Sequence, residues 1–122
     1  MKVQGIELVW IAVKDLKQAI AFYTETVGLT LREEVQEFGW AELSGPCGCL
    51  LGLAQENPQM EAKAGSHAVV SITVDNIEEA KEFFVQKGAT LVGDILDCGG
   101  HVRIQSFLDP DGNHMQLVQK LS

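Results

Sequence analysis

A β-branched apolar residue stands at every second position in two stretches of the chain, residues 9–13 and residues 70–74. Such alternation is typical of a strand with one face against a core. The similarity continues beyond these stretches, because residues 9–31 can be superposed on residues 70–91, which begin about 60 positions later. The pattern therefore predicts one small unit used twice.

An amphipathic helix is predicted after each alternating stretch. The apolar residues of 16–27 fall three or four positions apart, and residues 77–84 keep most of this spacing. Asp15 precedes the first helix, and Asp75 or Asn76 precedes the second, where a side chain can accept from free backbone N–H groups. Each helix is expected to end at a glycine, which tolerates the left-handed conformation: Gly28 and Gly88.

Three further strands are predicted in each copy. They are expected at residues 30–36, 38–43 and 49–54, and again at residues 90–96, 101–108 and 114–120, while the opening strand of the second copy is extended to 67–74. Pro110 and Gly112 predict a type I turn over residues 109–112. We interpret the chain as one domain over residues 1–122, with a first βαβββ module over about 1–54, a linker over 55–65 and a second module over about 66–122.

Charge and composition exclude several classes of partner. The formal net charge is −8 with a pI near 4.7, so no basic face is expected for nucleic acid or an anionic membrane. No stretch approaches the roughly 18 apolar residues of a membrane span, and no secretion signal is recognised, so we expect a cytoplasmic protein. Three cysteines fit a reducing compartment better than a disulfide framework.

Three phrases of the sequence carry a family resemblance: VKDLKQAIAFYTETVGL, its echo VDNIEEAKEFFVQKGA, and the closing FLDPDGNHMQL. Together they resemble the vicinal oxygen chelate superfamily, which includes glyoxalase I, extradiol dioxygenases, fosfomycin resistance proteins and bleomycin resistance proteins. The resemblance implies an α+β fold in which two βαβββ modules form a curled mixed sheet with a U-shaped cavity. It does not imply one reaction.

The resemblance also locates the positions where metal-dependent relatives carry ligands. These positions fall on Leu8, Gly52, Val69 and Gln116. Only Gln116 offers a donor atom, and a neutral amide oxygen is a weak ligand. We therefore expect neither the metal of the family nor another cofactor.

Strand alternation predicts which side chains line the cavity. If Val9 and Ile11 face the helix, Trp10 faces the cavity, and the same argument places Gln116 and His67 there. The candidate ligand-binding residues are Trp10, Trp40, His67, His101, Arg103 and Gln116. An apolar cavity with a few polar groups is typical of a small-molecule site.

Each candidate has an alternative interpretation. Arg103 suits a carboxylate or phosphate, yet an arginine on a strand often pairs with a neighbouring glutamate such as Glu42. The two tryptophans either stack on a planar ligand or fill the sheet. His67 lies near a vacant ligand position and is compatible with a shifted metal site shared with His101 or His114.

Two functions follow from these residues. The first is a binding protein that holds a small aromatic or anionic molecule without the family metal. The second is a lyase or isomerase related to glyoxalase I (lactoylglutathione lyase), either metal-independent with His67 or His101 as proton carrier or with a shifted metal site using both. A homodimer is expected because curled sheets of this size leave strand edges unpaired. Modules that pair within one chain and modules that pair across a dimer bury the same faces, so the sequence leaves both open.

Overall fold

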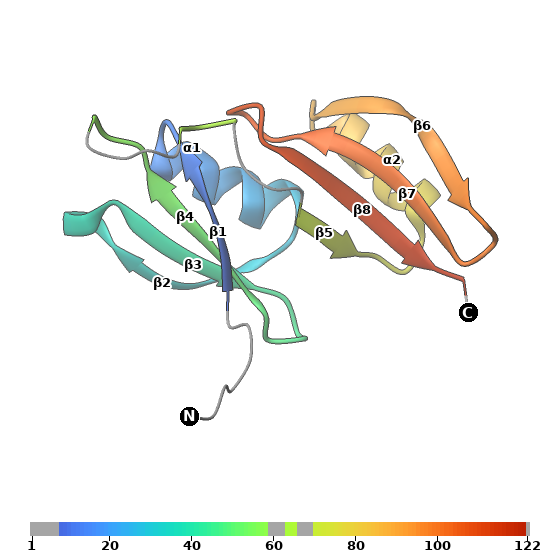
Figure 1. The fold of residues 1–122 in the computed structure, drawn as a ribbon, viewed down its shortest axis with the longest axis horizontal. Coiled ribbons are helices and arrows are strands. Elements are labelled where there is room, and N and C mark those ends of the chain that lie inside the picture. Colours follow the sequence, from blue (N-terminus) through green and yellow to red (C-terminus); the bar gives the residue numbers. More distant parts are fainter. Residues whose placement is uncertain (1–7, 59–62, 66–69, 122) are drawn as a thin grey trace.

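The fold is given by a computed structural model that describes residues 8–58, 63–65 and 70–121. The first module contains β1 (Leu8–Val13), α1 (Leu16–Ala21), β2 (Thr30–Val35), β3 (Trp40–Ser44) and β4 (Leu50–Gln55), and the second contains β5 (Val70–Thr73), α2 (Ile77–Gln86), β6 (Thr90–Cys98), β7 (Val102–Leu108) and β8 (His114–Lys120). Figure 1 shows the two modules side by side. The prediction of an α+β fold built from two βαβββ modules is confirmed.

Both helices begin and end where the sequence predicts. The side chains of Asp15 and Asn76 accept backbone N–H groups of the first turns at 3.1 and 3.0 Å. After Ala21 the first helix continues as a π-helical turn, Phe22–Thr26. Gly28 and Gly88 then take φ values of 91° and 77°, the left-handed conformation that glycine accepts without strain.

Two strand boundaries differ from the prediction by two residues, while the other described boundaries agree to within one residue. Residues Gln36–Phe38 form a short 3-10 helix and Gly39 has a φ of 62°, so β3 begins at Trp40. In the second module β6 continues to Cys98, two residues into the expected loop. Residues 67–69 of the predicted opening strand lie outside the described part of the chain.

Each module has its own four-stranded mixed sheet. The strand orders are β1-β4-β3-β2 and β5-β8-β7-β6, with the first strand of each module parallel to the last and the other pairs antiparallel. One face of each sheet is covered by helix, and we call the opposite face of each sheet its open face. Within the described residues, β1 and β5 are edge strands, so each has backbone groups that no neighbouring strand binds.

The helix-covered faces of the two sheets share one core. The ring of Phe22, at the end of the first helix, lies 6.3 Å from that of Phe107 on β7, and Phe84 on α2 lies 4.9 Å from Phe107. Ile11 and Leu117, from opposite modules, belong to the same buried cluster. The modules of one chain therefore meet through their helix-covered faces, and the open faces point away from the shared core.

A buried carboxylate joins the two modules. Asp109 accepts from the Tyr23 hydroxyl at 2.8 Å and from the Asn113 amide at 2.8 Å, and its other oxygen accepts two backbone N–H groups of its own turn. The Asn113 amide also donates to the carbonyl of Ala12 on β1 at 3.1 Å. The predicted turn is confirmed by the bond from the Gly112 N–H to the Asp109 carbonyl at 3.0 Å.

Burial raises the pKa values of two ionisable groups at this contact between the modules, Tyr23 and Asp111. Burial, reinforced by the negative charge of Asp109, raises the pKa of Tyr23 far above its ordinary value, so the hydroxyl remains a donor. Burial also raises the pKa of Asp111, whose carboxylate accepts the Lys14 N–H at 2.9 Å. The Gly65 N–H donates to the side chain of Asn113 at 2.8 Å. The turn thus contacts both the first module and the segment between the modules.

We predict that Tyr23→Phe lowers the free energy of unfolding by about 1–3 kcal/mol, because the buried Asp109 carboxylate loses a donor that water does not replace. Urea unfolding followed by circular dichroism measures the change. Ser71→Ala is the control: it also removes one hydroxyl, but on the open face, and should change stability by less than about 0.5 kcal/mol. Equal effects of the two variants would contradict a joint that depends on Asp109.

Candidate functional site

The open face of the first module carries an aromatic shelf, which we define as Trp10, Trp40 and Gly52. In the register of the sheet Gly52 on β4 lies between Trp10 on β1 and Glu42 on β3. A Cβ atom added to Gly52 would lie 2.8 Å from Cζ2 of Trp40 and 2.9 Å from Cβ of Trp10. The Trp40 ring therefore lies over Gly52, in space that a side chain at this position would otherwise fill.

A carboxylate is fixed beside this shelf. The indole N–H of Trp40 donates to Oε2 of Glu42 at 2.8 Å, and both side chains are half-buried. Trp10 retains 40% of its accessible surface. The side chains of Trp10 and Trp40, which the sequence predicted as ligand contacts, are thus brought together on one face.

Two charged residues of β2, Arg32 and Glu33, also lie on this face. The register shifts between Leu31 and Glu33, and Glu33 lies directly opposite Glu42. The Arg32 side chain donates through Nε to the hydroxyl of Ser44 at 2.8 Å. The sequence analysis missed both residues, although the polar run 32–34 interrupts strand alternation and is the signal that marks an irregular strand.

The open face of the second module mixes polar and apolar side chains. Gln116 on β8 lies between Ser71 and Ser106 in the register, and the Ser71 hydroxyl donates to its side-chain oxygen at 3.2 Å. Leu96, which is 62% exposed, lies opposite Ile104 on the same face. Gln116 is on the side that strand alternation predicted, but within one chain it does not face the aromatic shelf.

The predicted position of Arg103 in the cavity is wrong. Arg103 forms an ion pair with Glu78 of α2, so its side chain lies on the helix-covered face. Phe107 decides this orientation, because it is fully buried in the core and shares its strand face with Gln105 and Arg103. The expectation that an arginine here pairs with a glutamate is confirmed, although the partner is Glu78 and not Glu42.

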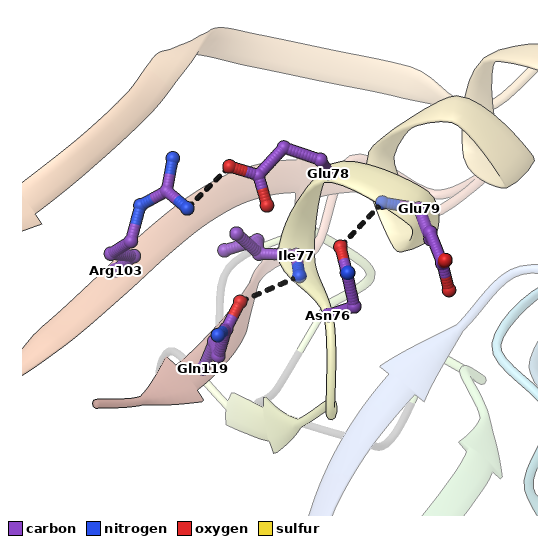
Figure 2. A network of polar contacts seen from close by, with 6 residues as sticks. All are labelled: Asn76, Ile77, Glu78, Glu79, Arg103 and Gln119. Atoms are coloured by element: carbon purple, nitrogen blue, oxygen red, sulfur yellow. Dashed lines mark hydrogen bonds and ion pairs between the residues drawn. The ribbon is translucent and has the colours of Figure 1, made fainter. Parts of the chain in front are cut away.

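Figure 2 shows that Arg103 belongs to a polar network at the start of α2. The side chain of Gln119 on β8 accepts the Ile77 N–H at 2.8 Å, and Asn76 caps the helix. The hydrogen bond from the Arg103 guanidinium holds the pKa of Glu78 below its ordinary value. These contacts attach α2 to β7 and β8, and they hold the Arg103 side chain on the helix-covered face.

Neither His101 nor His114, the two histidines in the described part of the chain, belongs to a group of side chains that could hold a metal. His101 is exposed in the turn between β6 and β7, and His114 begins β8. His67 lies outside the described residues. Across the described part of the chain, no three His, Cys, Asp or Glu side chains come close enough to hold one ion.

The residues at the expected metal positions do not fit a divalent ion. Leu8 is apolar, Gly52 is covered by the Trp40 ring, and Gln116 offers one amide oxygen that already accepts from Ser71. Val69 lies outside the described residues. This part of the sheet is built for an aromatic side chain where the metal-dependent relatives are expected to carry a carboxylate.

A cleft lies between the two modules. This cleft, of about 610 Å³, runs beside the edge strands β1 and β5 and has a mainly apolar lining that includes Val9, Leu29 and Ile72. The free thiols of Cys47 and Cys49 are exposed at its rim. None of the helices in the described segments is long and apolar enough to cross a bilayer.

We predict that Gly52→Ala destabilises the protein by about 1–3 kcal/mol, because the new methyl group displaces the Trp40 ring from its place on the sheet. In a Trp40→Ala background the same change should have less than half of this effect. A double-mutant cycle from urea unfolding measures the difference. If the two effects add, the Trp40 ring does not rest on Gly52.

A family model for the Glyoxalase/Bleomycin resistance protein/Dioxygenase superfamily matches residues 5–117. No curated protein matches the chain.

Solved structures match over the whole chain. TnmS3, an antibiotic binding protein from a Streptomyces species, is 25% identical, with 98% of each chain covered and a TM-score of 0.82. A glyoxalase family protein from Bacillus cereus is 23% identical, with 100% of this chain and 97% of the other covered and a TM-score of 0.81. A superfamily member from Sphaerobacter thermophilus is 20% identical, with coverages of 97% and 98% and a TM-score of 0.80. These matches show the same fold, and the family model, which spans both modules, shows that the chain belongs to the glyoxalase/bleomycin resistance protein/dioxygenase superfamily.

Proposed function

We propose that this protein binds a small aromatic molecule on the open face of its first module, without the metal of its enzymatic relatives. The sequence left aromatic and anionic ligands open. The aromatic shelf favours an aromatic ligand, because the Trp40 ring lies on Gly52 beside Trp10 and presents a flat apolar surface. Arg103, the expected anchor for an anion, is bound to Glu78 on the other face.

Exposure separates this proposal from the alternative in which the tryptophans only fill the sheet. Aromatic side chains that belong to the core are buried between helix and sheet, as those of Phe84 and Phe107 are. Trp10 and Trp40 lie on the face opposite the helix, and 40% of the Trp10 surface is exposed. Apolar side chains that gather on the open face of a sheet, as the exposed Trp10 and the half-buried Trp40 do, are typical of binding surfaces.

A structural neighbour supports a binding role. TnmS3, which matches 98% of this chain, is an antibiotic binding protein. The proposed lyase or isomerase activity has less support in the described residues, because His101 is an exposed turn residue and no group of metal-ligating side chains lies near it. Binding without chemistry is therefore the function that the geometry favours.

The proposed site is completed by a second copy of the chain. One open face gives a ligand only one wall, and the open faces of a single chain point away from each other. In a homodimer, the second module of the partner can cover the aromatic shelf with its own open face, which includes Gln116. The apolar cleft beside β1 and β5 indicates where the two copies meet, since both strands have an unpaired edge in the described chain.

The binding function is tested with a neutral aromatic probe, naphthylmethanol, by isothermal titration calorimetry. We expect Trp40→Ala to weaken binding about tenfold, because the stacking surface is lost. Phe83→Ala removes an exposed aromatic ring of α2 and is expected to leave the affinity unchanged. Unchanged affinity in Trp40→Ala would contradict the proposed site.

The oligomeric state is tested by size-exclusion chromatography with light scattering. We expect twice the chain mass of 13.3 kDa at micromolar concentration. Val9→Lys places a charge in the cleft beside β1 and should return the protein to the mass of one chain. Val85→Lys, on the exposed surface of α2, is the matched control and should remain dimeric. A single-chain mass for the unaltered protein would contradict the dimer.

A further inference from the structure

We propose that the aromatic shelf selects ligands that carry a positive charge on or beside a planar ring, and that Glu42 recognises this charge. The inference rests on the proposed binding function and adds the ligand's charge to it. Three features of the open face support it: the position of Glu42, the charges around it and the electrostatics of the tryptophan rings.

Glu42 is held where a stacked ligand would present its substituent. Its Oε2 accepts the Trp40 indole N–H at 2.8 Å, which fixes the carboxylate next to the ring that forms the shelf. A carboxylate oxygen accepts more than one hydrogen bond, so this contact leaves capacity for a donor on the ligand. A bond from an ammonium or amidinium group to a carboxylate is stronger than one between neutral groups.

The charges near Glu42 favour a cation. Glu33 lies directly opposite Glu42 on the same face, an arrangement that destabilises a sheet when the charges are alike. Among the described residues, neither carboxylate lies within ion-pair distance of a lysine or arginine. A bound cation would relieve the repulsion, and the net charge of −8 attracts cations to the protein as a whole.

The tryptophan rings contribute in the same direction. The face of an indole ring carries negative potential and attracts cations more strongly than the other aromatic side chains do. A planar cation stacked on Trp40 would therefore gain from the ring itself and from Glu42. A neutral ring of the same shape would gain only the stacking.

Arg32 on the neighbouring strand β2 favours the opposite charge. Its Nε donates to Ser44, which lies two residues beyond Glu42 on β3, about 7 Å along the strand. The guanidinium is thus attached to the end of the face, away from the centre of the shelf. An aromatic anion held by Arg32 is the competing outcome, and the experiment includes a variant for it.

Three probes with the same ring separate the possibilities: naphthylmethylammonium, naphthylmethanol and naphthoate. Calorimetric titration should show that the protein binds the ammonium compound about tenfold more tightly than the alcohol, and the naphthoate most weakly. In Glu42→Gln the amide oxygen still accepts from Trp40, so the shelf is kept while its charge is removed. This variant should bind the ammonium compound only as tightly as the alcohol, with the alcohol unchanged.

The remaining outcomes separate this inference from the binding function itself. Tightest binding of naphthoate, lost in Arg32→Gln, would overturn the cation preference and leave the aromatic site in place. Equal binding of all three probes would do the same. Failure to bind any of them would contradict both the preference and the proposed function. Because part of the preference is electrostatic, it should also decrease as salt is raised from low to physiological concentration.

Discussion

The arrangement of the whole chain depends on one buried carboxylate. Asp109 stands in the turn between the last two strands, yet its strongest contacts outside that turn reach the first module through the Tyr23 hydroxyl. An unpaired carboxylate would be costly in this place, so the two modules are stable together only when the helix of one supplies the donor to the turn of the other. Asn113 repeats the connection by bonding both Asp109 and the carbonyl of Ala12.

This joint determines where a site can form. Because Tyr23, Phe22 and Phe107 bring the helix-covered faces of both modules into one core, the faces opposite the helices point outward. Each chain then presents two separate open faces, one with tryptophans and carboxylates and one that mixes polar and apolar side chains. Two half-sites on opposite sides of one chain form a closed cavity only when a second chain is present, which is the physical basis of the proposed dimer.

At one position of a strand, this chain differs from what is expected of its metal-dependent relatives. At Gly52 the absence of a side chain allows the Trp40 ring to lie on the sheet, and the ring in turn fixes Glu42 through its N–H group. One glycine thus leaves an expected metal-ligand position without a donor side chain and allows a flat surface to form with a carboxylate beside it. On the proposed function, the same scaffold holds a planar ligand by stacking where its enzymatic relatives are expected to hold an ion.

The sequence by itself determined the repeat, the two helices with their caps at Asp15 and Asn76, and the turn over residues 109–112, because each depends on contacts within a few residues. Trp10 and Gln116 were also placed on the correct faces by strand alternation. Only the tertiary structure decided the rest. The bond between Tyr23 and Asp109 joins residues 86 positions apart, and Arg103 turns toward α2 because Phe107 must enter the core. Alternation fixes which residues share a face of a strand, but which face meets the helix depends on packing between distant parts of the chain.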